Sequence, residues 1–131
     1  MWGSFELTIF DEAFLVYSRF SHAKFNGSTF RNSGLMSARM RKTKCMGTIF
    51  DNAVIGFADF RKSNLTRASF NEVAMVADFR KADLRGADLS KATHLDRAQL
   101  VGSLFNRETL WPEGFDPEAA GATRKEYGEI P

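Results

Sequence analysis

The sequence has a single cysteine, Cys45, so no disulfide can form within the chain. One cysteine is typical of proteins that work in a reducing compartment. No run of about 18 apolar residues is present, and we therefore expect no membrane-spanning helix. The first residues lack a basic segment followed by an apolar block, so we expect no signal peptide and a cytoplasmic rather than a secreted protein.

Residues that could perform catalysis are also scarce. The only histidines, His22 and His94, lie far apart in the sequence, and no paired carboxylates, metal-ligand cluster or activated nucleophile is visible. We expect no enzyme activity, no cofactor and no bound metal. The net charge of +2 is small and indicates no dominant electrostatic partner.

What the sequence does have is a repeat of five residues. A large, mostly apolar residue stands at every fifth position from Phe5 to Met75, and a small or β-branched residue stands two positions before each one. A period of five matches neither an α-helix nor an alternating strand, so the chain is expected to turn a corner every five residues.

The repeat changes frame twice. After Met75 it slips by one residue, and its clearest copy, ADFRKADLRGADL, follows at residues 77–89. The segment between Leu89 and Leu100 is one residue longer than two repeat units require, and Phe105 ends the series. We expect a bulge there that turns Leu95 inward and His94 outward. Such irregular corners are either functional or tolerated insertions.

These units resemble the pentapeptide-repeat family, whose unit is A(D/N)LXX, over roughly residues 3–107. The segment TLWPEGFDPEAAGA also resembles the closing segment of cyanobacterial-type members. The resemblance implies an all-β fold, a right-handed quadrilateral parallel β-helix of about five coils, in which four units make the four sides of each coil. Inward residues would then stack every 20 positions. The four sides are numbered in chain order, so that side one begins at Phe5, side two at Phe10, side three at Leu15 and side four at Phe20. Side two carries a phenylalanine ladder: Phe10, Phe30, Phe50 and Phe70.

Two regions are expected: a β-helix at 1–107, and a C-terminal cap with a polar tail at 108–131. Asp116 is a good helix N-cap, Pro117 suits the first helical position and Gly121 can end the turn, which predicts a short helical cap. Solenoids need such caps. At the other end, the first coil with Trp2, Leu7 and Ile9 either covers itself or contacts a partner, and a homodimer through this uncapped end is possible.

Two outward surfaces are candidate binding sites. The first, the apolar strip, follows side three and marks a protein-binding surface, unless a loop or the tail covers it or the exposure has no function. Its residues are Phe14, Val16, Tyr17, Met36, Val54, Phe57 and Val76.

The second surface, the basic stripe, lies at the corner between side four and side one. It could attract an acidic protein or a phosphate backbone, or be an ordinary solvated face. Residues 13–105 hold 15 Lys and Arg against 7 Asp and Glu. The stripe consists of Arg39, Arg41, Lys42, Lys44, Arg61, Lys62, Arg80 and Lys81.

The leading hypothesis is a non-enzymatic protein–protein interaction or scaffold module that docks another protein or protein complex through the apolar strip. The resemblance implies a role in the assembly or regulation of a larger complex, including a photosynthetic one, with a position on the stromal side of its membrane. Two alternatives are open. Some family members are DNA mimics that inhibit a type II topoisomerase, but these are acidic along the rod. Direct nucleic-acid binding through the basic corner is weakened because no aromatic residues are interleaved there.

Overall fold

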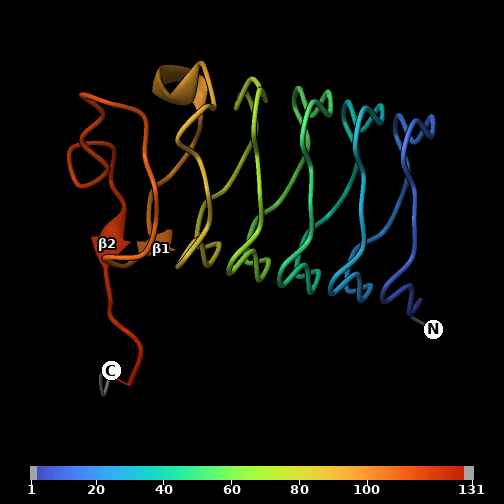
Figure 1. The fold of residues 1–131 in the computed structure, drawn as a ribbon, viewed down its shortest axis with the longest axis horizontal. Coiled ribbons are helices and arrows are strands. Elements are labelled where there is room, and N and C mark those ends of the chain that lie inside the picture. Colours follow the sequence, from blue (N-terminus) through green and yellow to red (C-terminus); the bar gives the residue numbers. More distant parts are fainter. Residues whose placement is uncertain (1–2, 129–131) are drawn as a thin grey trace.

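The computed structural model describes residues 3–128, which form a rod of stacked coils with the N-terminus at one end (Figure 1). Three short regular elements break the pattern of turns and isolated bridges: a 3-10 helix η1 (Leu95–Arg97) and two strands, β1 (Leu104–Phe105) and β2 (Thr123–Arg124). The two strands pair in parallel. Among the described residues, no helix is long and apolar enough to cross a membrane.

Backbone pairing repeats every 20 residues in the first coils, and the spacing changes to 19 and then to 21 or 22 residues beyond the two frame irregularities. Ser4 pairs with Lys24, and the next three bridges start at Ile9, Phe14 and Arg19, all of them parallel. Each coil therefore has four bridged segments, and hydrogen bonds between coils hold the rod together. The chain is thus a parallel β-helix with the predicted five-residue unit.

Most corners use the same backbone conformation. The second residue after the inward centre takes a positive φ at these corners, whether it is Gly47 (66°) or a bulky residue such as Tyr17 (61°) or Phe57 (60°). This left-handed conformation costs a non-glycine residue about 1–2 kcal/mol. Hydrogen bonds to the next coil offset the cost, since Tyr17 N–H donates to Met36 O at 3.0 Å.

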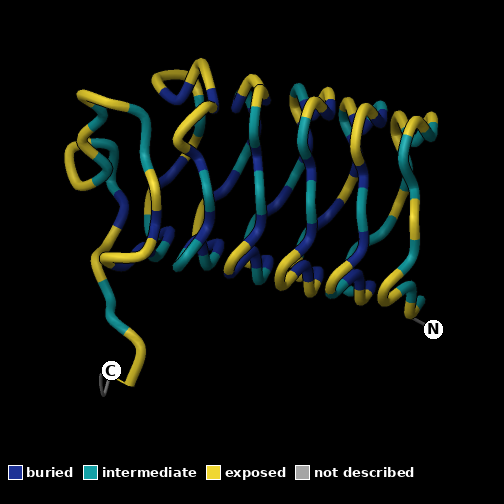
Figure 2. The backbone as a smooth tube through the Cα atoms, in the orientation of Figure 1, coloured by how far each residue is buried: buried dark blue, intermediate teal, exposed yellow. Residues whose placement is uncertain are grey.

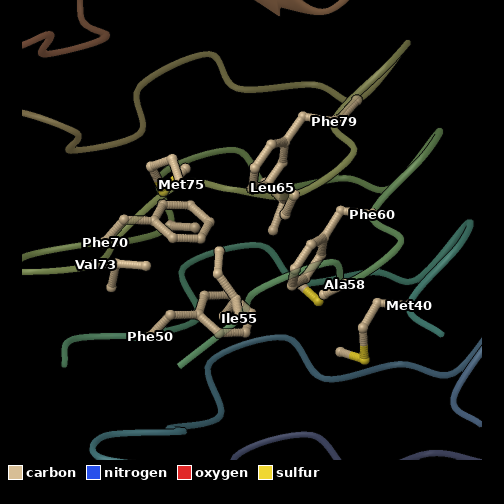
Figure 3. Packing of buried hydrophobic residues seen from close by; sticks show 14 of the residues in the cluster. Met40, Phe50, Ile55, Ala58, Phe60, Leu65, Phe70, Val73, Met75 and Phe79 are labelled. Carbon is tan, nitrogen blue, oxygen red and sulfur yellow. The ribbon is translucent and has the colours of Figure 1, made fainter. Parts of the chain in front are cut away.

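The inward columns form the core as predicted. From the second coil onward both the large central residues and the small residues two positions earlier are buried, Cys45 included. The phenylalanine ladder on side two is confirmed: successive ring centroids from Phe10 through Phe30 and Phe50 to Phe70 lie 4.9, 5.3 and 5.1 Å apart and nearly parallel. Figure 3 shows the rings of this ladder beside side four, where Phe60 stacks on Phe79 at 5.2 Å.

The N-terminal coil is the open end of the core. Its inward residues Phe5, Phe10, Leu15 and Phe20 are only partly buried and lie against the core from that side (Figure 2). Leu7 and Ile9 are exposed, so no described part of the chain covers this end. Trp2, which the sequence also places there, lies outside the described residues.

The C-terminal end corrects the prediction of a helical cap. Asp116 Oδ1 does accept hydrogen bonds from the N–H groups of Glu118 and Ala119, as an N-cap would. Only one turn follows, however, because the chain leaves it at Ala122, whose N–H donates to Pro117 O. No helix forms between residues 108 and 122.

Two aromatic side chains cover the core at the last coil. Trp111 and Phe115 pack against the core, and their ring centroids lie 5.2 Å apart. Trp111 also meets Phe105 edge to face at 5.9 Å. This cover thus rests on side chains alone, without the predicted helix.

The expected polar tail lies on the last coil. Strand β2 pairs with β1, and the Glu126 carboxylate accepts the backbone N–H of Arg107. The Tyr127 ring lies under the guanidinium of Arg85 at 4.9 Å. Up to Gly128 the tail therefore lies at the C-terminal end of the rod, while the division of the chain at residue 107 stays a prediction.

Candidate protein-binding face and basic corner

The apolar strip forms three neighbouring columns on side three. The first column follows the bridges that join Phe14 to Gly34 and Gly34 to Val54. The second contains Val16, Met36 and Val76, and the third contains the corner residues Tyr17 and Phe57. The structure therefore brings all seven predicted residues to one face of the rod.

The strip is bare in the structure. Phe14 is 94% exposed, Phe57 75% and Tyr17 74%, and the other four residues are exposed or half-exposed. The described tail ends on Arg85, so it does not cover this face. Of the explanations that the sequence left open, coverage by the tail up to Gly128 is excluded.

The first frame slip opens a hollow beside the strip. At this corner the usual left-handed residue is missing, and Ala77 N–H instead donates to Met75 O at 2.8 Å. The shortened corner leaves a hollow of about 350 Å³, called here the corner hollow. Its lining includes the apolar side chains of Phe57 and Val76, the carboxylates of Asp59 and Asp78, and three arginines: Arg61, Arg80 and Arg97. The sequence predicted the change of frame after Met75, but it did not predict the corner hollow.

The second irregularity lies at the same corner one coil later. His94 takes a left-handed conformation (φ 59°) at the start of η1, where it is exposed, and Leu95 is buried. The predicted inward Leu95 and outward His94 are confirmed. Arg97, at the end of η1, reaches the corner hollow.

The basic stripe is a true ladder of successive coils. Lys42 N–H donates to Arg61 O, and Lys62 N–H donates to Arg80 O, which places the arginine and lysine columns side by side. The lysines are exposed. Arg39 and Lys44 are exposed on the two sides that flank this corner, in the bridged positions.

Aspartates neutralise two of the stripe's arginines. Arg61 binds Asp59 through Nε–Oδ1 at 2.9 Å and Nη2–Oδ2 at 2.8 Å, and Arg80 binds Asp78 in the same manner. The hydrogen bond from Arg61 holds the pKa of Asp59 below its usual range and raises the pKa of Arg61. Asp83 pairs with Arg85 instead, outside the stripe.

The remaining cations of the stripe repel one another. Lys42, followed by Arg41 and Lys81, lowers the pKa of the exposed Lys62 ammonium. The Nε atom of Arg41 is buried and has no hydrogen-bond partner. Five cationic side chains line a second hollow of about 220 Å³, called here the basic hollow: Arg41, Arg61, Lys62, Arg80 and Lys81.

No catalytic arrangement is built around the cysteine. Burial raises the pKa of Cys45 to about 12, although hydrogen bonds with Thr43 and Thr48 act in the opposite direction. A thiol of this kind is protonated and unreactive at neutral pH. Within residues 3–128, no three or more His, Cys, Asp and Glu side chains are grouped so that they could hold a metal ion.

Residues 77–107 match the family model described as "Pentapeptide repeats (8 copies)". This segment of the chain therefore carries pentapeptide repeats. The matched segment begins at the frame slip and contains the clearest repeats, while the earlier coils follow the same geometry with more varied residues. No curated protein matches the chain.

Solved structures show the same fold. The pentapeptide repeat protein Rfr23 from the cyanobacterium Cyanothece 51142 is 22% identical, with a TM-score of 0.68 over 71% of this chain and 63% of that one. A pentapeptide repeat protein from the Arabidopsis thaliana thylakoid lumen is 20% identical, with a TM-score of 0.51 over 72% and 62%. QnrB1, a plasmid-mediated fluoroquinolone resistance protein, is 14% identical, with a TM-score of 0.52 over 95% and 85%. The chain thus spans less than two thirds of the first of these relatives, and the likeness concerns the fold.

Proposed function

We propose that this chain is a non-enzymatic interaction module that docks a partner protein through the apolar strip. The observation that carries the proposal is the exposure of Phe14, Tyr17 and Phe57 on one face of a rigid rod. Soluble proteins rarely leave contiguous apolar surface bare unless it binds something. Aromatic residues are also the usual anchors of protein interfaces.

The backbone supports this reading. Tyr17 and Phe57 hold left-handed corner positions at which Gly27, Gly47 and Ser37 are also found. Glycine occupies such a position at little cost, whereas a bulky side chain is strained there. Since leucine, lysine, arginine and glutamate occupy equivalent corners, this conformation is not peculiar to the aromatic residues, but it presents the side chain at the corner to solvent.

The corner hollow defines what the partner should look like. Phe57 in its lining continues the strip, and Arg97 in the same lining forms no ion pair among the described residues. A partner segment with an apolar anchor close to an acidic residue would fit both side chains. The module would then assist assembly or regulation of the complex to which that partner belongs.

The charge of the rod disfavours a DNA mimic. Residues 13–105 carry eight more basic than acidic residues, whereas a mimic of DNA has to present negative charge. The interaction proposal requires no such field, because its anchors are apolar.

A matched pair of triple variants tests the proposal. The strip variant carries Phe14→Ser, Tyr17→Ser and Phe57→Ser. Serine suits the corner positions of Tyr17 and Phe57, because Ser37 occupies the equivalent corner on the coil between them. The control variant changes three exposed apolar residues that belong neither to the strip nor to the first coil: Met46→Ser, Val101→Ser and Leu110→Ser.

Affinity capture from the source organism, with mass spectrometry, compares both variants with the parent chain. A partner that the control retains and the strip variant loses supports the proposal. If both variants retain the same partners, the strip is not the binding surface. Equal circular dichroism spectra and urea midpoints would show that neither variant has unfolded.

A further inference from the structure

We propose that the basic hollow binds a phosphate group. This inference goes beyond the docking function, because the hollow lies at the corner between side four and side one and contains none of the strip residues. Its lining consists entirely of cationic side chains from three successive coils. The argument rests on charge, on preorganised donors and on size.

The charge in the hollow is only partly balanced. Arg61 and Arg80 are paired with Asp59 and Asp78. Within residues 3–128, the other three lining cations, Arg41, Lys62 and Lys81, form no ion pair. Like charges on neighbouring coils, about 4.8 Å apart, repel one another. An anion bound between them would relieve that repulsion.

The donors are held in place before any ligand arrives. Each of Arg61 and Arg80 uses Nε and one N–H of Nη2 on its aspartate, which leaves Nη1 and the second N–H of Nη2 available. The aspartates thereby fix the orientation of the two guanidinium groups, as supporting residues do in binding sites.

The size of the hollow narrows the class of ligand. Its volume of about 220 Å³ is below the roughly 300–1,000 Å³ of pockets that enclose drug-sized ligands. It therefore suits a single tetrahedral oxyanion rather than a whole nucleotide. Guanidinium groups match the oxygens of phosphate, and a dianion gains more than a carboxylate from three unbalanced cations.

The lowered pKa of Lys62 agrees with this assignment. Lys42, Arg41 and Lys81 destabilise its protonated form, which is the effect expected of a positive potential at this corner. A bound dianion would act in the opposite direction. The exposed position of the lysines also lets an anion enter without a change in the coil.

The variants follow substitutions that the fold already accepts. The test variant carries Lys62→Asn and Lys81→Asn, and Asn32 and Asn52 occupy equivalent left-handed corner positions. The control is Lys44→Asn, a stripe lysine outside the hollow, whose neighbour in the bridged column is Asn64. All three are exposed lysines, so the control removes the same kind of charge, one unit against two, without touching the hollow.

Isothermal titration with inorganic phosphate, at constant ionic strength set by sodium acetate, measures the affinity. We expect saturable binding by the parent chain, a loss of about tenfold or more in the double variant, and little change in the control. A parallel titration with glycerol 2-phosphate distinguishes free phosphate from a phosphate monoester, and binding of either supports the site. The proposal is overturned if the parent chain binds neither ligand up to about 20 mM, or if the control loses as much affinity as the double variant.

Discussion

The guanidinium of Arg80 binds the carboxylate of Asp78 through two hydrogen bonds, Nε to Oδ1 at 3.0 Å and Nη2 to Oδ2 at 2.7 Å. Asp78 Oδ1 also accepts the backbone N–H of Arg80 at 3.1 Å. Arg61 and Asp59 repeat this arrangement one coil earlier. One aspartate therefore closes a corner of the coil and neutralises an arginine of the stripe.

The charge of Asp59 should stabilise the fold in a pH-dependent manner. Hydrogen bonding from Arg61 lowers the pKa of Asp59 in the folded state, so the stabilisation is complete above the unfolded value near 4 and disappears as pH falls through the folded pKa. We expect Asp59→Asn to cost about 1 kcal/mol at pH 7, a figure kept low because the pair is partly solvated. Urea unfolding at pH 7 and at pH 3 checks this.

The control for that variant is Asp88→Asn. Asp88 accepts hydrogen bonds from Ser90, and within the described residues it has no arginine partner. Its substitution should cost less at pH 7. A cost of Asp59→Asn that is as large at pH 3 as at pH 7 would contradict the role assigned to the ion pair.

The phenylalanine ladder should carry much of the stability. Phe50 is fully buried and stacks on Phe30 and Phe70, so we expect Phe50→Ala to cost about 3–5 kcal/mol in unfolding free energy. Phe14→Ala is the matched control, because Phe14 is exposed and should change stability by less than about 0.5 kcal/mol. Thermal unfolding of both variants makes the comparison, and similar losses would show that Phe14 is not a surface residue.

Much of this fold could be predicted from the sequence because the unit is short and regular. Most inward centres from Phe25 to Phe105 are identified by their spacing. At the second irregularity the five-residue step falls on His94, and the expected bulge turns Leu95 inward instead. The helical cap was wrong for a physical reason: Asp116 and Pro117 are good starting residues, but the segment is too short to continue past one turn.

Other features depend on contacts that the repeat does not specify. The aspartates of the repeat stand outside its inward positions, yet the side chains of Asp78 and Asp83 are only 16% and 19% exposed and bind arginines. The corner hollow lies where the left-handed turn residue after Met75 is missing. In the sequence, this corner is visible only as a repeat unit that is one residue short. Strand β2 pairs with β1 although the two segments lie about 19 residues apart and β2 carries no repeat motif, so the sequence does not predict this pairing.

The tail should depend on Tyr127. Its ring contacts the guanidinium groups of Arg67 and Arg85, with centroid distances of 5.5 and 4.9 Å. Such contacts contribute about 1 kcal/mol at exposed sites. In Tyr127→Ala we therefore expect amide hydrogen exchange at Thr123 and Lys125, whose N–H groups pair with the last coil, to be about fivefold faster. Tyr17→Ala should leave those two rates unchanged, and the same acceleration in both variants would contradict the assigned contact.

The thiol of Cys45 should be inert in the folded protein. Burial raises its pKa to about 12, so at pH 8 the side chain is both protonated and inaccessible. We expect no reaction with Ellman's reagent under native conditions and stoichiometric reaction in urea. Rapid labelling of the native chain would mean that the second and third coils open readily at side one.

The most direct test of the docking proposal is crosslinking from within the strip. A photoreactive phenylalanine analogue placed at Phe57 should crosslink a specific partner in the source organism, since this ring is exposed beside the corner hollow. The same analogue placed at Met46, which is also exposed but lies at the corner between side one and side two, is the control. A discrete crosslinked product from position 57 that is missing from position 46 is the predicted result. No product from position 57, or the same product from both positions, would contradict the account.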